Sequence, residues 1–172
     1  MRIQLFFITL GSLISVGCYA QNMFKEGVSK VKNEQFKIEY AGLDNDMIVI
    51  YNLKSKHAKG GPVSDNPLAA PLKREDFHFD RSAAYAIIQG IVKAKLENLR
   101  KNEDFVQVIL TFEKSGKLTD IGYGLKKTTL VSLGEIAEID ARLRDSIVAT
   151  FTGNTYKEYN FLIYSLGIIK FE

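Results

Sequence analysis

The sequence predicts an α+β domain in which two helices pack on an antiparallel sheet, in the order β-β-α-β-β-α-β. Several short segments alternate apolar and polar side chains with the period of two that a half-buried strand requires. Two longer segments repeat apolar residues at the spacing of an amphipathic helix. The chain has 172 residues, of which 46% are hydrophobic and 25% charged, and these proportions are typical of a single globular domain.

The first strand is expected at residues 35–40, where apolar and charged side chains alternate, and the second at residues 47–53. Gly, Asp and Asn within residues 42–46 tolerate the dihedral angles of a turn, so the two strands are expected to form an antiparallel hairpin. We interpret residues 21–34 as an N-terminal linker and residues 35–172 as the single domain.

A long loop is expected at residues 54–81. It contains all three prolines and both histidines of the chain, and it exceeds the roughly 12–15 residues usual for a connection without secondary structure. The segment is therefore either a functional loop or a flexible linker.

The two helices are expected at residues 82–101 and 132–150, where apolar side chains form one stripe and charged side chains lie off it. Asp80 or Ser82 can accept hydrogen bonds from the free amides at the start of the first helix. The second helix opens with Ser-x-x-Glu at residues 132–135, which is a capping box.

The remaining strands are expected at residues 105–113, 118–125 and 159–171. The first two are joined by a Lys-Ser-Gly-Lys turn whose glycine can adopt a positive φ. The last segment is apolar on both sides, which predicts a strand that is covered on both faces or paired centrally. Ser165 and Gly167 are expected to bulge or bend it.

The N-terminal residues 1–20 have the pattern of a secretory signal peptide: Arg2, an apolar run, and small residues before Ala20. The run is shorter than the roughly 20 residues of a spanning helix. The Ala-Gln junction that follows resembles exported proteins of Bacteroidetes-type bacteria. We therefore expect a periplasmic or extracellular protein.

Lipidation of Cys18 is the alternative, because residues 15–18 resemble a bacterial lipobox. Acyl chains on Cys18 would tether the protein as an outer-membrane lipoprotein. A membrane contact is expected only in that case.

The composition and the motifs exclude several functions. The net charge of +3 comes from 23 basic and 20 acidic residues without a basic block, so nucleic acid is not an expected partner. The sequence contains no Gly-x-Ser-x-Gly elbow and no phosphate-binding loop. We expect no catalytic residues and no cofactor.

One polar cluster is compatible with metal binding. In an extended chain Asp76, His78 and Asp80 share a face and can present two carboxylates and an imidazole to one cation. His57 is a further candidate ligand. The alternative is a solvated segment whose two intervening phenylalanines face the core.

Residues 110–120, with the sequence Leu-Thr-Phe-Glu-Lys-Ser-Gly-Lys-Leu-Thr-Asp, give the chain a family resemblance. Together with the elements expected over residues 82–171, they resemble the C-terminal domain of TonB and its relatives. The resemblance implies a small periplasmic fold with an exposed sheet edge that can pair with a partner's strand. The Tyr-Pro opening of the first helix, the Pro-rich spacer and a retained membrane anchor are missing, so energy transduction is not implied.

These observations predict a non-enzymatic protein of the cell envelope. It would bind another protein or a small ligand through a sheet edge or through the loop at residues 54–81. The alternative function is a metal-assisted hydrolase that uses Asp76, His78 and Asp80.

Overall fold

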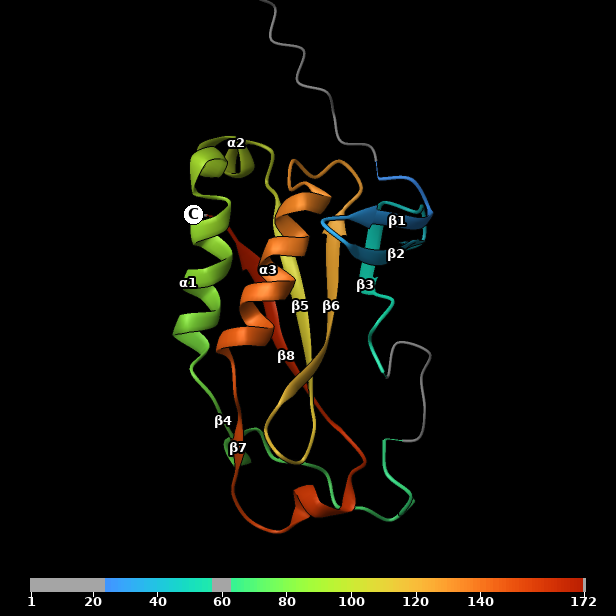
Figure 1. Cartoon of the computed structure of the whole chain (residues 1–172), viewed down its shortest axis with the longest axis vertical. Helices are drawn as coiled ribbons and strands as arrows, with labels where there is room; N and C mark the ends of the chain where they lie inside the picture. The colour runs from blue at the N-terminus through green and yellow to red at the C-terminus, as the bar shows by residue number, and fades with distance from the viewer. Residues whose placement is uncertain (1–23, 57–62, 172) are drawn as a thin grey trace, which may run out of the picture.

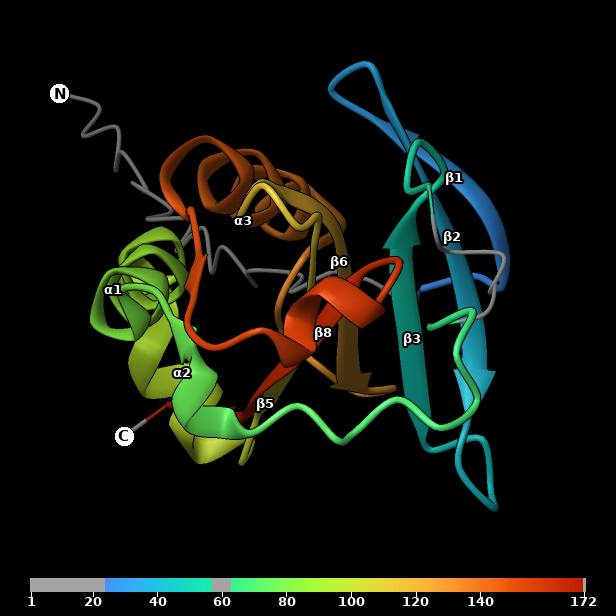
Figure 2. The ribbon, with the colours of Figure 1, turned by 90° about the horizontal axis from the view of Figure 1, so that it is seen from below.

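A six-stranded antiparallel sheet in the order β1-β2-β3-β6-β5-β8 forms the frame of the molecule in a computed structural model, which describes residues 24–56 and 63–171. Helices α1 and α3 pack together against one face of this sheet (Figures 1 and 2). The expected mixture of helices with an antiparallel sheet is thus confirmed. The expected signal peptide, Cys18 and His57 lie outside the described residues.

The strands of the large sheet are β1 (Gly27–Val31), β2 (Glu34–Ala41), β3 (Met47–Asn52), β5 (Phe105–Phe112), β6 (Leu118–Lys126) and β8 (Leu162–Lys170). A separate two-stranded ladder joins β4 (Phe77–His78) to β7 (Thr150–Phe151). The helices are α1 (Arg81–Ile91), α2 (Leu96–Lys101) and α3 (Leu133–Ser146), with 3₁₀ turns η1 (Arg74–Asp76), η2 (Lys93–Lys95) and η3 (Thr155–Glu158). None of the helices in the described ranges has the length and apolar character needed to cross a membrane.

The core lies between the helices and the face of the sheet toward which they pack. Alternate residues of β5 face it, and the same face of α3 contributes one side chain per turn. The fully buried members include Val106, Val108, Leu110, Ile88, Ile136 and Leu143. Burying a side chain of this size contributes roughly 1.5–3 kcal/mol.

Residues 21–34 are not a linker where the structure describes them. Strand β1 pairs antiparallel with β2 through a turn in which Lys32 and Asn33 have φ values of 49° and 68°. Phe24 is only 8% exposed, and the Tyr40 hydroxyl donates a hydrogen bond of 2.9 Å to its carbonyl. The sequence did not indicate this strand because its order comes from pairing with β2 rather than from an apolar face of its own.

The helix expected at residues 82–101 is divided into α1 and α2 by η2. Asp80 is the N-cap of α1, and its side chain accepts a hydrogen bond from the amide of Ala83 at 2.8 Å. At the junction, the Lys95 ammonium lies 2.6 Å from the Glu135 carboxylate and also donates to the carbonyl of Leu130. The break between α1 and α2 therefore places Lys95 where its side chain connects η2 to the start of α3.

Helix α3 opens with the predicted capping box, which is confirmed, but it ends at Ser146 rather than near residue 150. The chain becomes extended at Ile147, where ψ is 118°. Residues 150 and 151 then pair with β4. Such pairing between distant segments leaves no local signal in the sequence.

The last strand is an edge strand, so the prediction of a covered or centrally paired strand is wrong. Strand β8 pairs only with β5 in the described sheet. The predicted bulge is confirmed: Ser165 pairs with Ile109 and Gly167 with Val108, leaving Leu166 without a partner in β5. Both sides of the strand are apolar because this bulge changes the alternation, so that Leu162, Tyr164 and Leu166 face the core before it and Ile169 after it.

Candidate functional site

The structure does not gather Asp76, His78 and Asp80 around one point. The Asp80 carboxylate is used as the N-cap of α1. The other two side chains meet at Thr152, whose hydroxyl donates to Asp76 Oδ1 at 3.3 Å and lies 3.1 Å from His78 Nε2. Among the described residues, no group of three or more His, Cys, Asp and Glu side chains is placed to hold a metal ion.

The phenylalanines between these polar residues point inward. Phe77 is 5% exposed, and its ring centroid lies 4.9 Å from that of Phe151 and 5.4 Å from that of Tyr164. The Phe79 ring lies 5.0 Å from Tyr164 in an edge-to-face arrangement. These aromatic contacts fix the end of the long loop against β8.

Strand β8 is the most exposed apolar feature of the sheet. Ile163 and Ile168 are 48% and 58% exposed, and Ile109 of the neighbouring strand is 40% exposed. All three lie on the sheet face opposite the core, and we call them the isoleucine patch. An exposed apolar cluster on an edge strand is a site where another chain can add to the sheet.

The loop at residues 63–73 passes close to β8 without joining the sheet. Ser64 forms an isolated bridge with Tyr159, and the amide of Asn160 donates to the carbonyl of Val63 at 2.8 Å. The Tyr159 hydroxyl then donates to the carbonyl of Ala70 at 2.8 Å. Beyond this point no described strand pairs with the outer side of β8.

A groove of about 270 Å³ lies where the loop departs from the strand. It is lined by Leu72, Lys73, Arg74, Phe77, Ile163, Tyr164 and Ser165, and we call it the edge groove. It brings together the two surfaces that the sequence analysis considered separately, the sheet edge and the long loop.

The edge groove is positively charged. Arg74 Nε donates to the Tyr164 hydroxyl at 2.8 Å, and the Arg74 and Arg81 guanidinium carbons lie 5.3 Å and 4.9 Å from the Tyr164 ring centroid. The Lys73 ammonium forms no hydrogen bond or ion pair with another described residue. A carboxylate entering the groove would therefore meet cations that lack an acidic partner.

The other half of β8 is protected. At the bulge, the Tyr85 hydroxyl of α1 donates to the carbonyl of Leu166 at 3.0 Å. The amide of Gly167 donates to the Ser165 hydroxyl at 3.1 Å. Bulges and side-chain caps of this kind block strand addition, so the free part of the edge is limited to Leu162–Ser165.

The strongest pKa perturbation lies away from the edge groove, beneath α3. Burial, followed by the charge of Asp140, raises the pKa of the Tyr123 phenol well above its ordinary value. Burial lowers the pKa of Arg144, but the hydrogen bonds to Asp140 and the negative charges around the guanidinium together outweigh it and raise the pKa overall. These groups satisfy one another, so the cluster holds α3 on the sheet.

A second and larger cavity, of about 670 Å³, lies where β5 begins and β6 and β8 end. It is lined by side chains of both signs and by Phe105 and Phe171. Sequence reasoning did not identify it, because its residues come from four separate segments. Sequence analysis also did not identify Lys73 and Arg74 of the edge groove, although two adjacent cations just before the motif at residues 76–80 were a usable signal.

The comparisons with known proteins concern the fold. No protein-family model matches the sequence, and no curated protein matches it. Among solved structures, the chain is similar to a DUF5043 family protein from Bacteroides uniformis, with a TM-score of 0.61 and 13% sequence identity over 88% of this chain and 95% of that one. Similarity at this identity shows that the two chains share a fold.

Proposed function

We propose that this chain is an exported, non-enzymatic binding module that takes an extended segment of a partner protein along the free part of β8. The observation that carries the proposal is the edge groove, where an unpaired strand edge lies beside an ordered loop. A partner segment placed there would form main-chain hydrogen bonds with Leu162–Ser165, which is the β-augmentation mode of recognition.

The lining of the edge groove specifies the partner's side chains. On one face of the added strand, apolar side chains would pack beside Ile163 and extend the isoleucine patch. On the side of the loop, an Asp or Glu would pair with Lys73 or Arg74. The expected partner is thus an extended segment with alternating apolar residues and at least one carboxylate.

Two further features support the proposal. From α1 to β8 the elements of the large sheet and its helices follow in the helix-strand-strand-helix-strand order that the resemblance to the TonB C-terminal domain implies. The sequence of residues 1–20 has the pattern of an export signal. An exported module that pairs through a strand edge has no need of a catalytic group.

Selection from a library of short random peptides displayed on phage tests the binding mode directly. The selected peptides should share alternating apolar residues and an Asp or Glu, and they should bind the purified protein. Ile163→Lys should weaken their binding at least about tenfold, because it places a charged side chain beside the apolar residues of the bound peptide. The matched control is Val148→Lys, since Val148 is 63% exposed and lies outside the edge groove; it should bind as the unmodified protein does. Equal binding by all three proteins, or the absence of any selected peptide, would contradict the proposal.

Export has its own test. After expression in a bacterial host with an envelope, the N-terminus of the processed protein should be Gln21, and Cys18→Ser should leave its location unchanged. Release of the protein from the membrane by Cys18→Ser would instead support lipidation. Retention in the cytosol with residues 1–20 intact would contradict export.

A further inference from the structure

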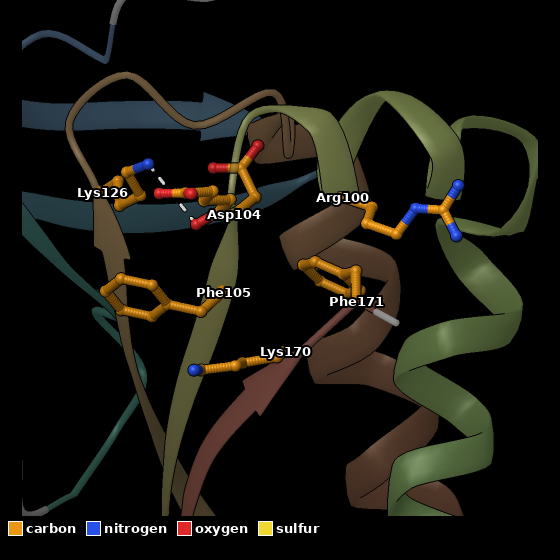
Figure 3. A pocket seen from close by; sticks show the side chains of 7 residues that line it. Arg100, Asp104, Phe105, Lys126, Lys170 and Phe171 are labelled. Carbon is orange, nitrogen blue, oxygen red and sulfur yellow. Dashed lines mark hydrogen bonds between the residues drawn. The ribbon is translucent and has the colours of Figure 1, made fainter.

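The cavity at the end of the sheet is a separate site with its own chemistry. We call it the sheet-end pocket; it is lined by Arg100, Glu103, Asp104, Phe105, Lys126, Lys170 and Phe171 (Figure 3). Its volume of about 670 Å³ falls in the range of roughly 300–1,000 Å³ in which small-molecule sites occur. It shares no lining residue with the edge groove.

Phe105 is the apolar centre of this site. The β5–β8 register pairs Phe105 with Lys170, and the β5–β6 register pairs the next residue, Val106, with Leu125, so that Lys126 follows beside Phe105. In Figure 3 the Phe105 ring lies between the Lys126 and Lys170 side chains. Because strands are spaced about 4.8 Å apart, the two lysine backbones are roughly 10 Å apart. Both ammonium groups can therefore reach one group lying on the Phe105 ring.

The two lysines lack an acidic partner within the described chain. Lys126 Nζ donates to the carbonyls of Asn102 and Glu103, at 2.7 Å and 3.4 Å. The Lys170 ammonium forms no hydrogen bond or ion pair with a described residue. Arg100 points away from the phenylalanines in Figure 3. The positive charge of the site is thus concentrated on either side of Phe105.

The acidic residues limit how much negative charge the site accepts. Asp104 is 2% exposed, and its Oδ2 accepts hydrogen bonds of 3.0 Å from the Asn102 side chain and from the Leu130 amide. It anchors the turn before β5. Glu103 is exposed at the rim, and its carboxylate adds to the charge of Asp104. Against these two carboxylates stand Arg100, Lys126 and Lys170. The lining therefore has one net positive charge, which favours a monoanion over a phosphate or another polyanion.

The apolar surface continues along the outer face of the sheet. Ile168, which pairs with Gln107, and then Ile109 follow Phe105 on the same face. A tail attached to the anion would lie across Phe105 and reach the isoleucine patch. The patch therefore offers an apolar surface that is continuous with the charged pocket.

We infer that the sheet-end pocket binds a monocarboxylate with an apolar tail. The carboxylate would lie between Lys126 and Lys170, and the tail would pack on Phe105. Alkyl and aryl carboxylates share this chemistry, and the probes below distinguish them. The inference does not depend on the proposed peptide binding, because the sheet-end pocket and the edge groove share no lining residue and only the isoleucine patch is common to both.

The test is titration of the purified protein with decanoate below its micelle concentration, with hexanoate, 4-phenylbutyrate and decanol as comparison probes, followed by calorimetry and amide chemical shifts. Decanoate should bind more tightly than decanol, and the shifts should be largest near residues 103–106, 126 and 168–171. Each methylene added between hexanoate and decanoate should raise the affinity about twofold. This factor corresponds to half of the free energy that a fully buried methylene contributes. The ratio of decanoate to 4-phenylbutyrate affinity then identifies an alkyl or an aryl ligand.

Three variants decide whether the carboxylate is recognised as inferred. Since it removes one charge-assisted hydrogen bond, Lys170→Gln should weaken decanoate binding about tenfold and leave decanol binding unchanged. Phe105→Ala should weaken both probes. Lys93→Gln, which changes an exposed lysine of η2, is the matched control and should affect neither. The inference is overturned if decanol binds as well as decanoate, if Lys170→Gln behaves like Lys93→Gln, or if no probe binds.

Discussion

The turn between β5 and β6 makes a sharp prediction for one glycine. Gly116 has a φ of 86°, and a Cβ placed on it would lie 1.8 Å from the carbonyl oxygen of Ala149. One hydrogen bond of 2.9 Å also joins the two residues, from the Ala149 amide to the Gly116 carbonyl. Gly116→Ala therefore both strains the turn and pushes away the segment that follows α3.

The magnitude follows from two contributions. An alanine in the left-handed region costs roughly 1–2 kcal/mol. The Ala149 carbonyl must move by roughly 1.5 Å to reach an ordinary contact distance, and the displacement breaks the hydrogen bond, which costs about 1 kcal/mol. We expect Gly116→Ala to lower the free energy of unfolding by about 2–3 kcal/mol and the Tm by roughly 5–10 °C.

Gly90→Ala is the matched control, because Gly90 lies inside α1, has no positive φ and has no atom within 4 Å of an added Cβ. It should raise the free energy of unfolding by about 0.5–1 kcal/mol, since alanine favours the helix. Urea unfolding followed by circular dichroism measures both changes. Destabilisation of less than about 0.5 kcal/mol by Gly116→Ala, or a shift of the two variants in the same direction, would refute the reasoning.

Three further predictions concern polar contacts. Asp140→Ala removes the carboxylate that lies 2.8 Å from Nε of the largely buried Arg144 guanidinium. We expect the free energy of unfolding in urea to fall by about 2–4 kcal/mol and to be partly restored by adding Arg144→Met. Strictly additive losses in the two variants would contradict the pairing. The Lys54 ammonium lies 2.8 Å from the Glu34 carboxylate and lowers the pKa of Glu34. The exposed pair should therefore stabilise the fold by about 0.5 kcal/mol near pH 7, and this contribution is lost as the pH falls through the lowered pKa. NMR titration should place the Glu34 pKa below that of a Glu in an unfolded chain, and a value at or above it would be contrary evidence. Ser132→Ala removes the cap of α3 and should cost about 1 kcal/mol by urea unfolding, with no measurable change counting against the capping role.

Elements whose order comes from their own residues were predictable from the sequence. The capping box at Ser132, the cap at Asp80 and the tight turn at Gly116 are each encoded within a few residues, and the structure contains all three. Alternating apolar residues likewise located β2, β3, β5 and β6 to within one residue at each end. Local patterns suffice where the hydrogen-bond partners are close in the chain.

Pairing between distant segments was not predictable. Strands β1, β4 and β7 have no apolar periodicity that distinguishes them from loops, because each gains its order from a partner strand. The position of β8 at the edge depends on which strand lies beside it rather than on its own apolar pattern. For the same reason the motif at residues 76–80 predicted a shared face, whereas Asp80 leaves the strand to cap α1.

The candidate sites likewise combine features that local sequence predicts with contacts between distant segments that it does not. The sequence analysis identified a sheet edge and the loop at residues 54–81 as binding surfaces, but it had no means of showing that they meet at β8. The sheet-end pocket combines α2, the turn before β5 and the ends of β6 and β8. Only the folded chain brings Lys126 and Lys170 to either side of Phe105.

Amide hydrogen exchange along β8, with and without a selected peptide, tests the central claim most directly. In the free protein, amides of Leu162–Ser165 that point away from β5 should exchange rapidly, because no described strand covers them. Saturation with peptide should slow these amides at least about tenfold while leaving α1 and α3 unchanged. Protection confined to the helices, or unchanged exchange in β8 at saturating peptide, would contradict binding at this edge.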